Sequence, residues 1–369
     1  MAKVAIVQMV YNGMKYIPQS FDSMVNQTYK DVEVIAVING NADGGKEYIQ
    51  QHYPSVRIIE PSENLKFVRG HNLIFETVDA EFFQLVNQDL ILQPTYVEAI
   101  LQAFADPAVG AANGKIFQYD FDANVASDVL DTTGIVVSKN GRGKSRGQNE
   151  QDTGAYDSQL EIVGVDGAAC MYRKSALEVV KMPCALSSSR MRGSKLASRA
   201  ASNARLETSV DSRLRGNDRE GFEYFDVDFE MYWEDVDLSL RLQNAGFKCR
   251  FVPAAVGYHG RTAGSSKKGY KDVAAFKEHH KKLPTWIKEY NYKNHIFLVI
   301  KNFPQFYWKF FVREFFMLGY ICVFETSTLK ILPTMIRQLP AMWRKRKWIQ
   351  KHRSSADWVG LLNDKGLLS

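Results

Sequence analysis

The segment Phe82-Phe83-Gln84-Leu85-Val86-Asn87-Gln88-Asp89 joins a mostly apolar run to three polar residues. Its first five residues have the composition of a buried strand. Because ligands of α/β sheets lie beyond the carboxyl ends of the strands, we expect the Asp89 carboxylate at a ligand-binding edge. An aspartate in this position is also common as a helix cap or turn former, so the segment alone leaves both roles open.

Short β-branched runs alternate with amphipathic stretches of helical length through the first third of the chain. The runs predict strands at 4–7, 32–38, 56–59, 82–86 and 109–112. The stretches between them predict helices near 15–27, 44–52, 68–79 and 94–105, with Pro94 at a first helical position. Such alternation is typical of an α/β domain with a mostly parallel sheet.

Polar residues also follow two other predicted strands. Tyr11 and Asn12 come after the first strand, and the run from Asn39 to Gly44, which includes Asp43, comes after the second. Since the carboxyl ends of parallel strands share one edge of a sheet, we expect these residues near Asp89.

A second acidic cluster stands in Met231-Tyr232-Trp233-Glu234-Asp235. Val236 and Leu240 are spaced for one face of a helix and Gly246 fits the position just past its end, so Glu234 and Asp235 are expected at the helix N-terminus. Acids there often do no more than balance the helix dipole. The aromatic residues before the pair favour a second role, because a carboxylate held in a dry site becomes more basic.

His259 follows another apolar stretch. A lone histidine is usually a core or surface residue, yet one at a strand end, downstream of two acidic clusters, is also suited to complete a metal site.

The bulk composition indicates a globular protein. The chain has 369 residues, of which 45% are hydrophobic and 24% charged, and this excludes disorder throughout. The four cysteines lie far apart without metal-ligand spacing, so we expect reduced thiols in a cytosolic protein and no zinc site. The N-terminus leads directly into the first predicted strand, and we expect no signal peptide.

The formal net charge of +6 is unevenly distributed. Residues 342–353 carry six basic side chains and no acid, and residues 184–222 carry eight basic and four acidic ones. The remainder is therefore mildly acidic, which argues against a nucleic-acid binder with a basic face on the folded domain.

Residues 184–222 are rich in Ser, Arg, Ala and Gly and show no sustained apolar period. We interpret them as a flexible insertion, most simply a long solvated loop without a role. Without it, Met182-Pro183 would run directly into Glu223-Tyr224.

Beyond about residue 270 the pattern becomes helical and aromatic. Its longest uninterrupted apolar run, 315–324, is about half of the ~20 residues that a membrane-spanning helix needs. Mixed aromatic and basic residues suit a helix lying on an anionic membrane surface. A plain helical subdomain packed on the sheet would carry the same aromatics, so both readings stay open.

In combination these segments carry a family resemblance. The order of residues 4–12, 39–44, 70–72, 87–89, 165–169, 233–237 and His259 resembles the family-2 inverting glycosyltransferases of GT-A fold, in particular their rhamnosyltransferase-like bacterial branch. The resemblance covers roughly residues 3–265. It implies a GT-A domain over 1–265, with the insertion at 184–222, and a C-terminal helical region over 266–369 that associates with membranes.

The resemblance also implies a role for each matching residue. Asp235 corresponds to the catalytic base of a Glu-Asp motif that includes Glu234, and Asp89, Asn87 and His259 correspond to positions at the metal. The expected nucleotide and donor site comprises Tyr11, Asn12, Asn39, Asp43, Arg69, Asn72 and Asp166.

Two positions depart from the family pattern. Ile38 stands where an acid usually contacts the nucleobase, and Asn87 stands where the first acid of the metal motif is usual. A metal would then be held mainly by Asp89 and the diphosphate, as Mg²⁺ often is.

The sequence thus predicts an inverting glycosyltransferase, with rhamnose as one candidate sugar. It would use Mg²⁺ or Mn²⁺, a nucleotide-diphosphate sugar donor and a lipid-linked or cell-surface glycan acceptor, at the cytoplasmic face of the cell membrane. The alternative is a catalytically inactive nucleotide- or glycan-binding module of the same fold. A nicotinamide dehydrogenase is disfavoured because only one glycine, Gly13, follows the first strand where three are needed.

Overall fold

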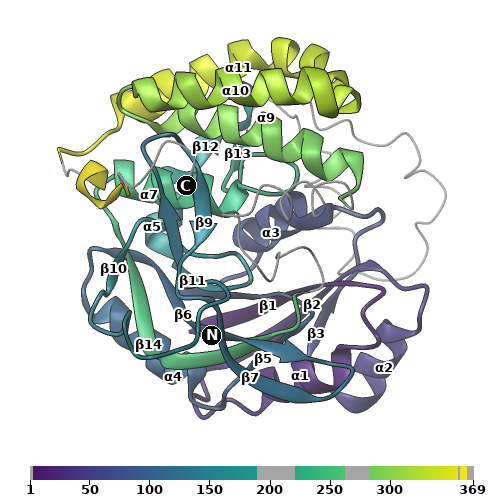
Figure 1. Ribbon diagram of the computed structural model, residues 1–369. Helices are drawn as coiled ribbons and strands as arrows, with labels where there is room; N and C mark the ends of the chain where they lie inside the picture. Colours follow the sequence, from purple (N-terminus) through teal and green to yellow (C-terminus); the bar gives the residue numbers. More distant parts are fainter. Residues whose placement is uncertain (1–2, 189–220, 262–282, 356–357, 364–369) are drawn as a thin grey trace.

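The computed structural model describes residues 3–188, 221–261, 283–355 and 358–363 (Figure 1). The strands within these ranges are β1 (Val4–Tyr11), β2 (Val32–Gly40), β3 (Arg57–Ile59), β4 (Phe82–Val86), β5 (Leu90–Leu92), β6 (Val109–Asp120), β7 (Val125–Thr132), β8 (Ile135–Val137), β9 (Gly143–Ser145), β10 (Glu161–Ile162), β11 (Ala169–Arg173), β12 (Met182–Pro183), β13 (Phe222–Glu223) and β14 (Lys248–His259). The α-helices are α1 (Ile17–Val25), α2 (Gly45–His52), α3 (Lys66–Thr77), α4 (Tyr96–Leu101), α5 (Lys174–Val180), α7 (Glu234–Asn244), α9 (Thr285–Asn302), α10 (Trp308–Phe324) and α11 (Leu332–Lys351).

Ten of the described strands form one large mixed sheet, and β8-β9 and β12-β13 form two small separate sheets. The order of the large sheet is β10-β14-β6-β11-β4-β1-β2-β3, and β5 and β7 pair with β14 and β6. The run β4-β1-β2-β3 is parallel, whereas β11 is antiparallel to both of its neighbours. All five predicted strands form, and each predicted helix is present. The predicted position of Pro94 is wrong. Helix α4 begins at Tyr96, so the proline lies in the turn before the helix and not at its first position.

Strand register brings the predicted site segments to one edge. Val7 of β1 lies beside Ile35 of β2 and Leu85 of β4. The three strands run in the same direction, so the residues after their carboxyl ends meet at this edge.

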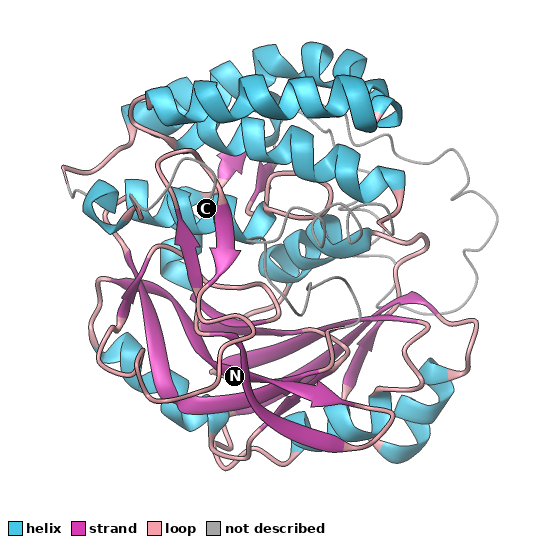
Figure 2. Cartoon of the chain, in the orientation of Figure 1, coloured by secondary structure: helices cyan, strands magenta, loops and turns pink. Residues whose placement is uncertain are grey.

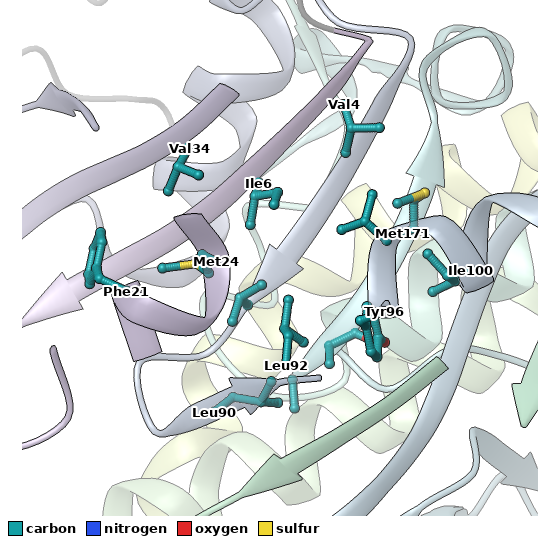
Figure 3. Packing of buried hydrophobic residues seen from close by; sticks show 14 of the residues in the cluster. Val4, Ile6, Phe21, Met24, Val34, Leu90, Leu92, Tyr96, Ile100 and Met171 are labelled. Carbon is teal, nitrogen blue, oxygen red and sulfur yellow. The ribbon is translucent and has the colours of Figure 1, made fainter. Parts of the chain in front are cut away.

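Each face of the sheet has its own hydrophobic core. Helices α1, α2 and α4 cover one face, and Phe21, Ile49 and Tyr96 belong to the core that they form with the sheet (Figures 1 and 3). Helices α3, α5 and α7 cover the other face with Phe75, Leu177 and similar residues. The helices thus enclose the sheet on both sides (Figure 2).

The C-terminal helices form a further layer over α7 (Figure 1). A third hydrophobic cluster joins Val236 and Leu240 of α7 to Phe297 of α9 and Met342 of α11. The predicted C-terminal helical region is therefore present, and it shares a core with the helix that carries Asp235.

The two sides of the predicted insertion meet directly. Strand β12 pairs antiparallel with β13, with Met182 opposite Glu223, and the Cys184 N–H donates to the Gly221 carbonyl at 2.9 Å. Most of the insertion, 189–220, lies outside the described residues.

Candidate functional site

The loops after β1 and β2 are tied to each other by two polar side chains. The Asp43 carboxylate accepts the Met14 N–H at 2.7 Å and the Gly45 N–H at 3.2 Å. The Asn12 side chain accepts the Ala42 N–H at 2.9 Å. Asn12 and Asp43 therefore hold the two loops together through backbone amides.

Tyr11 is the most open aromatic residue at this edge, with 55% of its surface exposed. Its ring lies so close to Gly40 that a Cβ there would approach it within 2.8 Å. Its backbone N–H donates to the Gln88 side chain at 3.0 Å, which connects the end of β1 to the segment after β4. An exposed ring at a strand end is suited to stack on a flat ligand.

Asn39 and Asn72 use their amides inside the protein. Asn39 accepts the Leu65 N–H at 3.1 Å and donates to the Lys66 carbonyl at 3.2 Å. Asn72 exchanges two hydrogen bonds with the backbone of Phe225, at 2.7 and 2.8 Å. Arg69, which is half-buried, makes no hydrogen bond or ion pair with another described residue.

Asp89 lies beside His259 at the end of β4. One carboxylate oxygen is 3.2 Å from Nε2 of His259, and Nδ1 of the same ring is 2.8 Å from Asp131 at the end of β7. Burial alone would lower the pKa of His259, but the carboxylates of Asp131 and Asp89 raise it to about 9. The imidazole therefore carries both protons at neutral pH and bridges the two acids.

Arg261 continues this chain of charges toward Asp166. Its guanidinium lies 2.8 Å from Asp131 and 3.3 Å from Asp166. Burial works against ionisation of Asp166, yet Arg261 and the Ser145 hydroxyl, at 2.8 Å, lower the pKa of its carboxyl. Asp131, Ser145 and Arg261 were not predicted, because their segments carry no motif and only the fold brings them to Asp166.

Asp235 occupies the first turn of α7, as predicted. Its carboxylate accepts the Gly167 N–H at 2.9 Å and remains partly exposed. Burial and the nearby Asp166 charge raise its pKa to about 6. A carboxylate with this pKa is ionised at neutral pH and basic enough to take a proton from a hydroxyl in a transition state.

Glu234 differs from its neighbour. Its side chain is buried, and no hydrogen bond from the described part of the chain reaches Oε2. Burial, together with the charge of Asp235, raises its pKa well above the ordinary value for glutamate. Burial thus favours the protonated form of Glu234.

The comparison with known families concerns the sheet domain. Residues 5–180 match the sequence model of glycosyl transferase family 2. The chain carries a glycosyl transferase family 2 domain. The match contains Tyr11, Asp89 and Asp166 but ends before α7, so it does not include Asp235.

Individual glycosyltransferases match the chain over short stretches. An uncharacterized glycosyltransferase of Haemophilus influenzae is 29% identical over 101 residues, which is 27% of this chain and 31% of that protein. Glycosyltransferase GlyA of Streptococcus pneumoniae is 23% identical over 122 residues, 32% of this chain and 17% of that protein. A teichoic acid poly(glycerol phosphate) polymerase of Staphylococcus epidermidis is 27% identical over 108 residues, 28% of this chain and 15% of that protein. The chain thus matches less than a third of the length of each.

A solved structure of GalNAc-T7 with UDP, GalNAc and Mn²⁺ resembles the whole chain. Its TM-score is 0.54 at 9% sequence identity, over 95% of this chain and 58% of that one. At this identity the likeness concerns the fold alone. The predicted GT-A fold, with its C-terminal helical region, is confirmed.

The residues predicted at the metal offer two oxygen donors. Asn87 makes no side-chain hydrogen bond to another described residue, and Asp89 lies two positions further on. His259 has both ring nitrogens on carboxylates, so it holds Asp89 in place and its role as a ligand stays a prediction. In the described ranges no group of three or more His, Cys, Asp or Glu residues is arranged to hold a metal ion. Asp89 and Asn87 fit Mg²⁺ or Mn²⁺ only if the substrate supplies further oxygens.

Three buried histidines in the described part of the chain are expected to titrate very differently. Burial lowers the pKa of His71 to about 4, and burial and Arg313 lower that of His295 to about 4, whereas that of His259 is about 9. In metal-free protein, NMR should show the His259 ring protons titrating near pH 9. The charged His259 stabilises the fold fully below its unfolded pKa of about 6.5, and this contribution is lost as the pH rises through 9.

Asp131→Asn provides the control for this titration. It removes the shorter of the two carboxylate contacts and should lower the His259 pKa without moving that of His71. A His259 titration near pH 6.5 in the unaltered chain would contradict the assignment.

Proposed function

We propose that this chain transfers a sugar from a nucleotide-diphosphate donor to a hydroxyl of a glycan acceptor, with inversion at the anomeric carbon. The observation that carries the proposal is Asp235, a partly exposed carboxylate with a pKa of about 6 beside Asp166. A family-2 domain supplies the class of reaction, and this carboxylate supplies the base.

The reaction is a single displacement. The acceptor hydroxyl attacks the anomeric carbon while its proton passes to Asp235, and the bond from that carbon to the diphosphate oxygen breaks with its electron pair. The charge that develops on the leaving diphosphate needs a partner. Asp89 and Asn87 would hold a divalent metal there, which as a Lewis acid would neutralise the diphosphate.

The other predicted residues divide into two groups at the donor. Tyr11 presents an exposed ring for the nucleobase, and Arg69, which has no ion-pair partner among the described residues, presents a cation for a phosphate. The amides of Asn12, Asn39 and Asn72 and the carboxylate of Asp43 mainly fix the loops around the donor. Asp166, held by Arg261 and Ser145, is placed to orient a sugar hydroxyl.

Nucleotide release from a panel of donors tests the proposal. Purified chain is incubated with Mn²⁺ or Mg²⁺, a bacterial membrane-lipid extract, and UDP-, GDP- or dTDP-sugars, dTDP-rhamnose included. We expect free nucleoside diphosphate from one donor, in greater amount with the extract than without. Release from no donor, with a known glycosyltransferase active in the same extract, would contradict the proposal.

An inactive binding module of the same fold is the second candidate. It is suggested by Ile38, whose side chain is buried in the hydrophobic core and so does not contact a nucleobase. In this case a nucleoside diphosphate binds, and calorimetry detects it, but no donor in the panel is turned over.

We also propose that the acceptor is carried on a membrane or cell-surface polymer. The teichoic acid polymerase among the relatives supports this class of acceptor. On α10 the exposed positions carry no charge and include Trp308, Phe311, Phe315, Phe316, Val323 and Phe324. The exposed part of α11 adds Ile336 and Trp343.

The charges around this apolar face favour an anionic membrane surface at the inner side of the cell membrane. Between residues 306 and 355 the acids are Glu314 and Glu325, and both pair internally, with Arg313 and Lys288. Exposed bases, among them Lys330, Arg337 and Lys347, lie on the neighbouring turns. In the described part of the chain no single helix meets the requirements of a membrane span, although Trp308–Phe324 and Thr326–Lys351, bent by 114°, meet them as a pair.

Substituting both Phe315 and Phe316 by aspartate is expected to reduce binding to vesicles that contain phosphatidylglycerol at least about tenfold, because two aromatic side chains would no longer enter the interface. Co-sedimentation measures the effect. Val125→Asp, at another exposed apolar residue, on β7, should bind as the unaltered chain does. Equal binding of the double variant would exclude this face as the membrane contact.

A further inference from the structure

The turn before α7 has an unusual backbone. Glu230, Tyr232 and Trp233 have φ angles of 60°, 66° and 72°, in the left-handed region that side chains other than glycine rarely adopt. Such residues persist only where the surroundings hold them in place, and they gather at functional sites. The turn ends at Glu234, so its conformation sets where Asp235 lies.

The side chain of Asn294, on α9, binds the backbone of this turn at three carbonyls. Nδ2 of Asn294 lies 2.9 Å from the carbonyls of Phe229 and Met231 and 2.8 Å from that of Tyr232. Asn294 is completely buried, so water cannot replace it on these three carbonyls. One helical turn earlier, Asn291 accepts the indole N–H of Trp233 at 2.9 Å.

The C-terminal end of α9 contacts the first turn of α7. Nδ2 of Asn302 donates to Asp237 at 2.7 Å, and Nζ of Lys301 lies 2.6 Å from the same oxygen. Asp237 in turn donates its N–H to the Trp233 carbonyl at 2.8 Å. Helix α9 therefore contacts the chain on both sides of Asp235.

We propose that α9 positions the catalytic carboxylate, with Asn294 as the principal positioning residue. Asn294 fixes the left-handed turn, and the turn aims Asp235 at Gly167 and the acceptor hydroxyl. The inference rests on the proposed function and adds that the C-terminal helices are part of the catalytic unit. The family-2 match covers residues 5–180, and both the turn and α9 lie beyond it.

Asn294→Ala and Asn294→Asp test the proposal in the full chain. With the donor that the panel identifies, we expect kcat to fall by about ten- to a hundredfold, as for a misplaced catalytic group, while KM for the donor stays unchanged. Asn294→Asp should lose more, because it presents a carboxylate to three carbonyls. The acid limb of the pH profile of kcat should also move, since Asp235 leaves its contact with Gly167.

Gln27→Ala is the matched control. Gln27 is also a buried amide that donates to two backbone carbonyls, of Ser23 and Gln93, but it lies on the opposite side of the sheet. It should lower stability in a similar way and leave kcat and the pH profile as in the unaltered chain. Equal kinetic effects of the two alanine variants would overturn the proposal.

Hydrogen exchange of residues 229–237 tests whether Asn294 holds the turn, and it needs no enzymatic activity. In Asn294→Ala these amides should exchange at least about tenfold faster than in the unaltered chain, because the bonds that hold the turn are lost. In Gln27→Ala their exchange should not change. Unchanged exchange in Asn294→Ala would overturn the inference. If no donor is turned over but exchange accelerates, the proposed transferase fails and the positioning of Asp235 by α9 stands.

Discussion

Replacing Asp235 with asparagine is expected to lower the rate of sugar transfer by roughly 10²- to 10⁴-fold, the usual contribution of a general base. The amide has nearly the same shape and can still accept the Gly167 N–H through its oxygen. It cannot take the proton of the acceptor hydroxyl. Donor binding should stay intact, because Tyr11, Asp89 and Arg69 are on other elements, and calorimetry with the nucleoside diphosphate checks this.

The pH profile separates loss of the base from loss of structure. Burial and Asp166 raise the pKa of Asp235 to about 6, so kcat of the unaltered chain should fall below this pH as the carboxylate takes up its own proton. The residual rate of Asp235→Asn should show no such limb. A limb near pH 6 in the variant would assign the titration to another group.

Glu234→Gln is the control within the same pair. Burial already favours the protonated form of Glu234, so a neutral amide of similar size should cost far less activity than Asp235→Asn. The opposite order of effects would reverse the assignment of the base.

The sheet could be predicted from the sequence because β-branched runs and the polar residues after them report local structure directly. The bounds of α7 could be predicted for the same reason. The helix begins at Glu234, and Gly246, with a φ of +91°, lies just past its end. The acids and bases that complete the site are a different case. Arg261, just after β14, contacts both Asp131 of β7 and Asp166, and spacing along the chain contains no information about that meeting.

The basic cluster at 344–353 shows the same limit. The sequence gives only the number of basic side chains there, and in the structure two of the six contact the interior of the protein. Arg346 donates to the carbonyls of Ile300 and Phe303 at 2.8 and 2.6 Å. Lys345 is fully buried. Only the acids that it meets, more than a hundred positions upstream, explain its place.

Those acids form a buried charge network between the sheet domain and the C-terminal helices. Nζ of Lys345 contacts Asp226, lies 2.8 Å from Asp228 and 3.2 Å from Glu223. Lys301 of α9 lies 2.5 Å from Asp226 and 2.6 Å from Asp237. Burial would raise the pKa of Asp226, but the two lysines hold it well below its ordinary value. Asp226 therefore depends on the two lysines for its charge.

Lys345→Met is accordingly expected to lower the free energy of unfolding by about 3–5 kcal/mol, since breaking a buried pair leaves an uncompensated charge. Chemical denaturation followed by circular dichroism measures it. Lys347→Met is the matched control, because Lys347 is exposed on the same helix and the substitution should change the free energy by less than about 0.5 kcal/mol. An unchanged midpoint for Lys345→Met would show that the acids do not depend on this lysine.

The shape of the transition tests the predicted domain boundary at 265/266. Because Lys345 and Lys301 pair with Asp226, and Phe297 packs with Val236, the helices and the sheet domain should unfold together in one transition, shifted to lower denaturant in Lys345→Met. Two transitions, the first confined to the C-terminal helices, would make residues 266–369 an independent unit. In that event Lys345→Met should shift the first transition, whereas Ile49→Ala, in the core below the sheet, should shift the second.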